Sequence, residues 1–150
     1  MTNKKDLIYK IVSIIALSAV MITIFCLSHE NATDSKETST AVTSWLSKIF
    51  GNVPDGVVRS IAHGCEYAAL GFLMYNVFLS FKKRISPVIS VALSFFYAVT
   101  DEIHQLFVPG RAFQFVDLAV DLVGILIGTV AILILIRLIS KAKNKSCNSK

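Results

Sequence analysis

The residues best suited to chemistry occur in a short segment that combines carboxylates with an imidazole. Asp101 and His104 are three residues apart, and Glu102 and Gln105 lie beside them. A carboxylate next to an imidazole can act as a general base with an orienting partner. The same side chains are compatible with half of a paired metal site, or with hydrogen bonds to an amine, hydroxyl or sugar.

Helical spacing places most of these residues on one face. Tyr97, Asp101, His104 and Gln105 follow the i, i+4, i+7, i+8 pattern of a single helix stripe. Glu102 lies about 100° off that stripe, so we expect it to face a loop or another helix.

A second carboxylate–imidazole pair, His63 and Glu66, occurs upstream. With Tyr67 and Leu70 it follows i, i+3, i+4, i+7, again one face of a helix. The candidate catalytic residues are His63, Glu66, Asp101, Glu102 and His104, although the sequence does not decide whether a reaction is catalysed.

The third polar segment contains Asp117, Asp121, Gly124 and Gly128, which fall on one line of a helix. A Gly-x-x-x-Gly pattern permits a close approach between helices. We expect this packing to draw the acidic end of the helix against its neighbours.

The composition is that of a membrane protein. Of the 150 residues, 54% are hydrophobic, whereas soluble domains usually have roughly 45–50%. The excess falls in four blocks long enough for a hydrocarbon core of about 30 Å, at residues 7–28, 61–81, 86–107 and 116–139. We therefore predict an all-α membrane protein, with four transmembrane helices in one domain over residues 1–140. The first block is too long for a signal-peptide h-region, and no Ala-x-Ala pattern follows it, so we expect it to be retained.

Basic residues indicate the orientation of the helices. If the N-terminus is cytoplasmic, the inside holds eleven of the fifteen basic residues, as the positive-inside rule favours. These are Lys4, Lys5, Lys10, Lys82, Lys83, Arg84, Arg137, Lys141, Lys143, Lys145 and Lys150. Both termini are then cytoplasmic, and residues 141–150 form a basic tail that we expect to be disordered. The net charge of +5 is explained by orientation and by anionic lipid headgroups, so nucleic acid is not expected as a partner.

The connections follow from this orientation. Residues 29–60 form one long external loop. Within it, residues 41–50 have apolar side chains at helical spacing, and we expect them to lie along the outer membrane surface as an amphipathic segment. A Pro-Asp-Gly turn at residues 54–56 is expected to lead into the second span. Pro87 suits the first turn of the third span.

This topology brings the polar residues together at the extracytoplasmic ends of the helices, within roughly 10 Å of one interface. They are Ser28, His29, His63, Glu66, Asp101, Glu102, His104, Gln105, Asp117 and Asp121. Each alone has an ordinary explanation, such as packing or a favourable charge at a helix N-terminus. As a set they exceed what packing requires, and ionisable residues inside a membrane indicate function. We expect almost nothing polar in the inner halves of the same helices.

Cysteines and metals add little to the hypothesis. Cys26, Cys65 and Cys147 are odd in number and have no Cys-x-x-Cys spacing. They predict neither a disulfide framework nor a zinc knuckle. We assign no metal, and the sequence identifies no cofactor.

The polar motifs resemble the VanZ-like family of small integral membrane proteins. The resemblance rests on the block Asp-Glu-Ile-His-Gln-Leu-Phe-Val-Pro-Gly-Arg at residues 101–111, and it covers roughly residues 10–135. The other matching residues are Ser28, Arg59, His63, Glu66, Tyr67, Leu70, Gly71, Asp117 and Gly124. Two positions depart from the family pattern, which often has Lys at the position of Ser60 and Asn at that of Asp121.

The resemblance implies a link to glycopeptide resistance. The family takes its name from a protein associated with low-level resistance to teicoplanin, a lipoglycopeptide that acts outside the cytoplasmic membrane. An outward-facing polar site fits an action on an outer-leaflet lipid, a cell-wall precursor or a lipoglycopeptide.

Three mechanisms stay open at this point. In the first, the protein binds or handles a membrane lipid or a lipid-linked envelope molecule, and Arg111 grips a phosphate or carboxylate with its planar guanidinium. The predicted ligand-binding residues are Ser28, Tyr67, Tyr97, Gln105, Arg111, Asp117 and Asp121. The second is a membrane-embedded hydrolase or transferase that uses the carboxylate–histidine pairs. The third is a proton-coupled transporter or flippase, for which four spans would form a small pathway unless the protein is a homo-oligomer.

Overall fold

The chain folds into helices that run nearly the full length of its apolar blocks. The computed structural model describes residues 4–29, 55–81 and 86–148, and for residues 55–59 and 146–148 it describes the backbone alone. The helices are α1 (Lys4–Ser28), α3 (Asp55–Ser80), α4 (Pro87–Gln105) and α5 (Phe115–Asn148). The described residues contain no strand, so the predicted all-α fold is confirmed.

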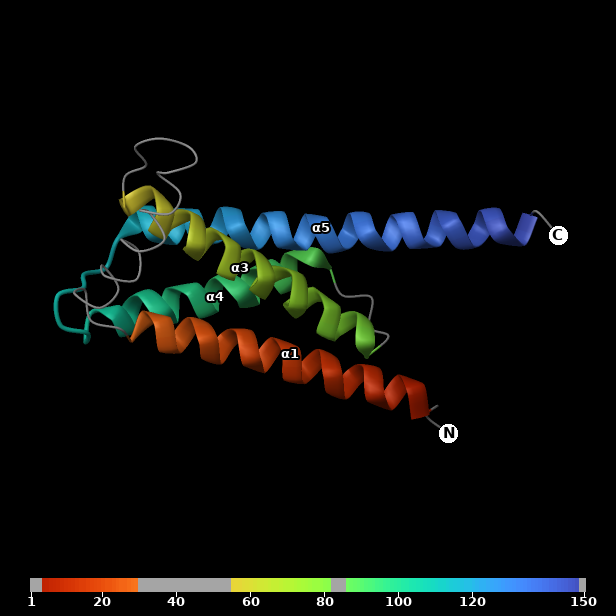
Figure 1. The fold of residues 1–150 in the computed structure, drawn as a ribbon, viewed down its shortest axis with the longest axis horizontal. Helices are drawn as coiled ribbons and strands as arrows, with labels where there is room; N and C mark the ends of the chain where they lie inside the picture. The colour runs from red at the N-terminus through yellow and green to blue at the C-terminus, as the bar shows by residue number, and fades with distance from the viewer. Residues whose placement is uncertain (1–3, 30–54, 82–85, 149–150) are drawn as a thin grey trace.

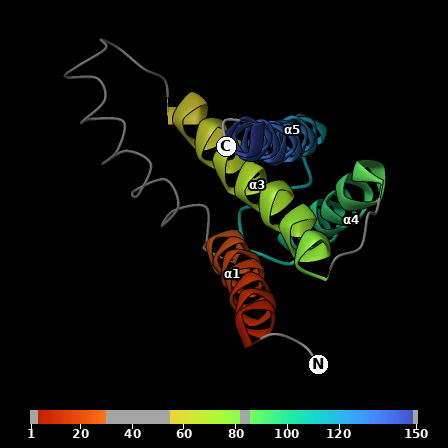
Figure 2. The same ribbon diagram turned by 90° about the vertical axis from the view of Figure 1, so that its right-hand side faces the viewer.

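Helices that follow each other in the chain run in opposite directions (Figure 1). As a result, the start of α1 and the end of α5 lie at one end of the bundle, and the end of α1, the end of α4 and the starts of α3 and α5 lie at the other (Figure 1). α3 is the central helix, because among the described helices it makes the most extensive contacts, above all with α5 and α1 (Figure 2). We call the end that holds the α4–α5 connection the motif end.

The closest packing joins α3 to α5, as the Gly-x-x-x-Gly pattern predicts. A Cβ atom on Gly124 would overlap the carbonyl oxygen of Gly64, and one on Gly128 would overlap the carbonyl oxygen of Ala68. Both glycines of α5 are buried. The predicted close approach is therefore confirmed, and it brings the start of α5 against the start of α3.

The largest differences from the predicted helix boundaries are at the start of α3 and the end of α5. α3 begins at Asp55, six residues before the predicted span, so the expected turn residues Asp55 and Gly56 are helical. α5 continues through Asn148, so the prediction of a disordered tail after residue 140 is wrong for residues 141–148. The tail is rich in Lys, a good helix former, and its positive charge favours a helix C-terminus. By contrast, α4 begins at Pro87 as predicted.

Two of the described helices are long and apolar enough to cross a membrane, at Lys4–Ser28 and Phe115–Lys145. Only 17% and 28% of their most apolar windows are buried inside the protein. A core helix of a soluble protein would be mostly buried, whereas these helices expose rows of large apolar side chains such as Ile15, Ile22, Ile127 and Leu138. An exposed apolar surface of this extent fits a lipid environment better than water.

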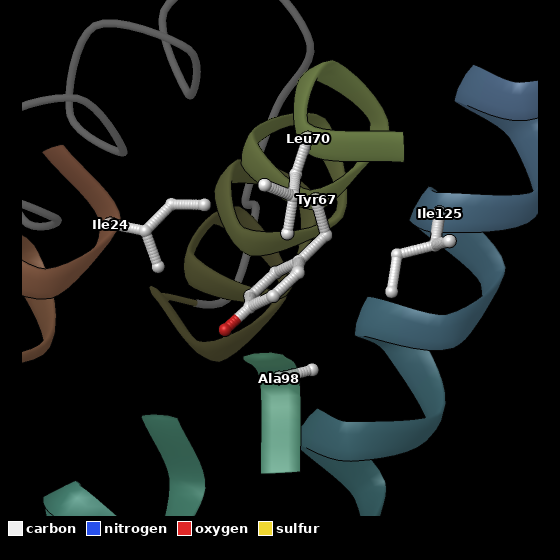
Figure 3. Close-up of a cluster of buried hydrophobic side chains, with 5 residues drawn as sticks. All are labelled: Ile24, Tyr67, Leu70, Ala98 and Ile125. Atoms are coloured by element: carbon white, nitrogen blue, oxygen red, sulfur yellow. The ribbon is translucent and has the colours of Figure 1, made fainter. Parts of the chain in front are cut away.

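A layer of buried apolar side chains crosses the bundle where the described helices meet (Figure 3). It consists of Ile24 from α1, Tyr67 and Leu70 from α3, Ala98 from α4 and Ile125 from α5. Tyr67 points from α3 into the space between the other helices (Figure 3). Its hydroxyl group therefore reaches beyond the apolar layer to the polar residues at the motif end.

The expectation of almost nothing polar in the inner halves of the helices is wrong. Ser90 and Ser94 on α4 and Thr129 on α5 are buried beyond the apolar layer. Between α1 and α3, Tyr9 donates a hydrogen bond to Asn76, and Asn76 donates one to the buried Ser13. A search for charged residues misses these groups, because hydroxyl and amide side chains are neutral.

The predicted amphipathic segment at residues 41–50 cannot be compared with the structure, because it lies outside the described residues.

Candidate functional site

The centre of the motif end is the carboxyl group of Asp101 on α4. Its Oδ2 atom accepts hydrogen bonds from Ser28 Oγ at 2.6 Å, Tyr67 OH at 3.0 Å and Gln105 Nε2 at 3.3 Å. Gln105 Nε2 also donates to Ser28 Oγ at 2.9 Å. The predicted convergence of these four side chains is therefore confirmed, and they come from three different helices.

The second oxygen of Asp101 is in a different situation. The residue is 4% exposed, and its Oδ1 atom has no hydrogen-bond partner. A carboxylate can accept several hydrogen bonds at each oxygen. Because an unsatisfied buried polar atom is costly, it usually indicates a bound water, a ligand or a reactive group. Three donors hold one oxygen of Asp101 in place, whereas the other oxygen is buried without a hydrogen-bond partner.

Glu102 faces the α4–α5 connection, as its position off the stripe predicted. Its side chain is 1% exposed, and its Oε2 atom accepts a hydrogen bond from the backbone N–H of Gln114 at 3.0 Å. Gly110 has a φ of 80°, a conformation suited to glycine, and it allows the connection to return towards α4. Glu102 thus fixes the loop that leads into α5.

The acidic residues of three helices lie within electrostatic range of one another. Asp121 on α5 is 1% exposed, and its charge is influenced by Glu66, Asp101, Glu102 and Asp117. The Oδ1 atom of Asp121 has no hydrogen-bond partner. These five carboxyl groups, which we call the acidic cluster, make acidic side chains more numerous than basic ones at the motif end, among the described residues.

Arg111 lies between the acidic cluster and α1. Its guanidinium is close enough to Glu66 and Glu102 to influence both carboxyl groups. Its Nη2 atom also donates to the carbonyl oxygen of Leu27 at 3.3 Å, in the last turn of α1. A cation is favourable at a helix C-terminus, so Arg111 both balances the acids and caps α1.

A pair of imidazoles joins α1 to α4. His29 Nδ1 lies 3.2 Å from His104 Nε2, so one ring donates a hydrogen bond to the other. The ring of Phe25 packs against His104, with ring centroids 4.7 Å apart. Asp101 and His104 were predicted as an acid–imidazole pair, but the hydrogen bonds in the structure join them to other residues. Asp101 accepts from three side chains, and His104 is paired with His29.

A small pocket opens at the same seam between α1 and α4. It has a volume of about 150 Å³ and is lined by Phe25, Tyr97, Thr100, Asp101 and His104. Tyr97 OH donates to the carbonyl oxygen of Met21 at 2.7 Å, which fixes its ring. We call this space the seam pocket.

Comparison with known proteins agrees with the motifs at this end of the bundle. The VanZ/LLP1 family matches residues 13–137, which is most of the chain. The chain belongs to the VanZ/LLP1 family. Searches of curated proteins and of solved structures found no match.

Membership of the VanZ/LLP1 family, together with the apolar helices α1 and α5, indicates a membrane protein. It is also consistent with an association with teicoplanin resistance. The matched region includes every candidate site residue, from Ser28 to Asp121.

The remaining predicted residues lie on the helices that surround the hydrogen-bonded centre of the VanZ/LLP1 site. His63 and Glu66 are half-buried on α3, His63 one turn before Tyr67 and Glu66 directly before it. Asp117 lies in the first turn of α5. Among the described residues, no three His, Cys, Asp or Glu side chains are grouped closely enough to hold a metal ion.

Sequence reasoning missed four residues that shape the site. His29 was placed at this end but not paired with His104, and Phe25, Thr100 and Gln114 were not considered. The pairing of His29 could have been suspected from its position directly after Ser28, a predicted site residue. Phe25 carried no signal, because an aromatic residue in an apolar span is ordinary.

Proposed function

We propose that this protein binds the polar headgroup of an outer-leaflet lipid or of a lipid-linked cell-wall precursor. The observation that carries the proposal is the carboxyl group of Asp101. It is buried, three side chains fix one of its oxygens, and the other oxygen has no partner. Such a preorganised acceptor beside a small pocket suits recognition of a polar group at low conformational cost.

The proposal includes the topology. α1, α3, α4 and α5 would each cross the membrane, with both termini cytoplasmic and the motif end on the extracytoplasmic side. Support comes from the antiparallel order of the helices (Figure 1) and from the basic residues at the opposite end of α1 and α5, such as Lys4, Lys5 and Lys145. A headgroup in the outer leaflet would then lie level with Asp101.

Arg111 and Asp101 would bind different parts of the ligand. Arg111 has a planar guanidinium, a group that suits a phosphate or carboxylate, and its contact with Leu27 O holds it at the end of α1. Asp101, with the acidic cluster and the histidines, would accept hydrogen bonds from an amine, hydroxyl or sugar. A lipoglycopeptide such as teicoplanin, or the precursor that it targets, presents groups of both kinds to this face of the membrane.

Native mass spectrometry of the full chain, purified in mild detergent, tests the proposal. The wild-type protein should retain a lipid or precursor that Asp101→Asn loses. Asp6→Asn, the same change at the other end of α1, should retain it. An absence of any bound ligand on the wild type, or equal retention by Asp101→Asn, would contradict the proposal.

A second candidate function is proton-coupled translocation. It is favoured by the buried hydroxyl groups of Ser90, Ser94 and Thr129, none of which has a hydrogen-bond partner. They continue the polar groups of α4 and α5 inward beyond the apolar layer. Proteoliposomes with an internal pH dye would report proton uptake on ligand addition. A protein that only binds the ligand would cause no proton uptake.

A further inference from the structure

The seam pocket differs from the rest of the motif end because its walls are largely aromatic. Phe25 from α1 and Tyr97 and His104 from α4 supply three rings, and Thr100 supplies a hydroxyl. The fifth wall residue, Asp101, is the most deeply buried of the set. The pocket therefore combines largely aromatic walls with one buried acidic residue.

The walls are held in place by contacts outside the pocket. Tyr97 is anchored on Met21 O, and Thr100 Oγ1 donates to the carbonyl oxygen of Tyr97 at 2.7 Å. Phe25 and His104 pack ring against ring, and His29 holds the far side of His104. The pocket is thus preformed, which lowers the cost of binding a ligand.

Aromatic faces and a carboxylate share one preference, which is a positive charge. The electron-rich face of an aromatic ring attracts ammonium groups, and aromatic cages recognise choline and methylated lysine in this way. A carboxylate at the inner end adds a direct ionic partner. A volume of about 150 Å³ equals roughly five waters at about 30 Å³ each, which is room for one small ammonium group and not for a sugar ring with its substituents.

The surrounding groups favour the same ligand. The acidic cluster contributes five carboxyl groups, and Arg111 acts on two of them, Glu66 and Glu102. Carboxyl groups accept hydrogen bonds from an ammonium, and those that are ionised attract it. The described residues offer no metal-like grouping of three ligands, whereas an ammonium group needs only a carboxylate and aromatic faces.

We propose that the seam pocket binds an ammonium group, and that the protein's ligand is therefore an amine-bearing molecule. The inference rests on the proposed headgroup-binding function and names the chemical class of the headgroup. The unpartnered Asp101 Oδ1 accepts the ammonium, and the rings of Phe25 and Tyr97 cover its sides. When the ligand also carries a phosphate, Arg111 lies at the adjacent end of α1 to receive it.

Choline and its uncharged isostere, dimethylbutanol, test the charge requirement on the wild-type protein. Equilibrium dialysis with radiolabelled choline measures binding to the full chain in detergent, and dimethylbutanol is the competitor. A second arm uses nanodiscs, with native mass spectrometry comparing phosphatidylethanolamine and phosphatidylglycerol of identical chains. The soluble arm reports a free amine, and the nanodisc arm reports a lipid headgroup.

Phe25→Leu is the informative variant, because Phe25 is half exposed and its loss should not unfold the bundle. Removal of one aromatic face should weaken binding of the charged probe about 2- to 30-fold. Phe96→Leu is the matched control, since Phe96 is an exposed ring on α4 that does not line the pocket. It should leave binding unchanged.

The inference holds if choline binds in preference to dimethylbutanol, or phosphatidylethanolamine in preference to phosphatidylglycerol, and if Phe25→Leu weakens that preference. It is overturned if neither arm shows a charge preference, or if Phe25→Leu and Phe96→Leu behave alike. A copurifying ligand without an amine would overturn this inference and leave the headgroup function intact. The absence of any copurifying ligand would instead count against the headgroup function.

Discussion

Ser28 Oγ lies 2.6 Å from Asp101 Oδ2, so the last residue of α1 is hydrogen-bonded to a buried carboxyl group of α4. The same oxygen accepts the hydroxyl group of Tyr67 from α3. Three of the described helices therefore meet at one carboxylate. Any ligand bound by Asp101 is positioned by the packing of all three.

Ser28→Ala should destabilise the protein by about 1–3 kcal/mol, because it removes a donor from a buried carboxyl group and an acceptor from Gln105. Denaturant unfolding in detergent measures the change. Ser18→Ala is the control, since Ser18 is exposed on the same helix, and it should stay within about 0.5 kcal/mol of the wild type. Equal stability of the two variants would remove Ser28 from the network.

Gly128→Ala should destabilise the α3–α5 packing by about 1–3 kcal/mol, because its Cβ atom would overlap the backbone of Ala68 and force the helices apart. The matched control is Gly64→Ala. Its Cβ atom would lie 3.6 Å from Val120 Cγ1, an ordinary contact, so this variant should be neutral or slightly stabilised. Thermal unfolding of both proteins decides between close and loose packing, and equal melting temperatures would contradict the close approach.

The packing of α5 against α3 shows what could be predicted from the sequence. Spacing along one helix places Asp117, Asp121, Gly124 and Gly128 on one face, and small residues predict that this face meets another helix. Helical spacing also correctly placed Glu102 on a different face of α4 from Asp101. These predictions succeed because they need only the geometry of a single helix.

Relations between helices were harder to predict. Spacing cannot tell which residue of α1 lies level with His104, so the contacts with Phe25 and His29 were missed. The buried hydroxyl groups of Ser90 and Ser94 escaped for another reason: serine is common in apolar helices and changes their hydropathy little. The depth of a residue in the bundle, and its contacts with other helices, depend on how the helices pack. A single sequence does not give this packing.

The proposed orientation predicts opposite reactivity at two positions. In a background with Cys26 and Cys65 replaced by alanine, Cys147 in the last turn of α5 should resist a membrane-impermeant thiol reagent in intact cells. A cysteine at Ala112, which is exposed in the α4–α5 connection, should react in the absence of Cys147. Permeabilised cells provide the control, in which both should react. Labelling of Cys147 from outside would place the motif end in the cytoplasm.

Arg111→Lys should separate the two roles of Arg111. An ammonium can still satisfy the Leu27 carbonyl at the C-terminus of α1, so stability should stay close to that of the wild type. A bidentate contact with a phosphate or carboxylate needs the planar guanidinium, so ligand retention should fall as it does for Arg111→Ala. The expected loss is about 2–5 kcal/mol of binding free energy, measured by native mass spectrometry. Full retention by Arg111→Lys would assign Arg111 to charge balance alone.

The central claim is that a specific ligand occupies the site beside Asp101, and crosslinking in living cells tests it most directly. A diazirine amino acid at Thr100, in the wall of the seam pocket, is compared with one at Val130, which is exposed on α5 away from the pocket. After illumination, the mass of each adduct identifies the captured molecule. The proposal predicts one dominant polar lipid or precursor at Thr100 and a mixture of bulk lipids at Val130. The same mixture at both positions would contradict it.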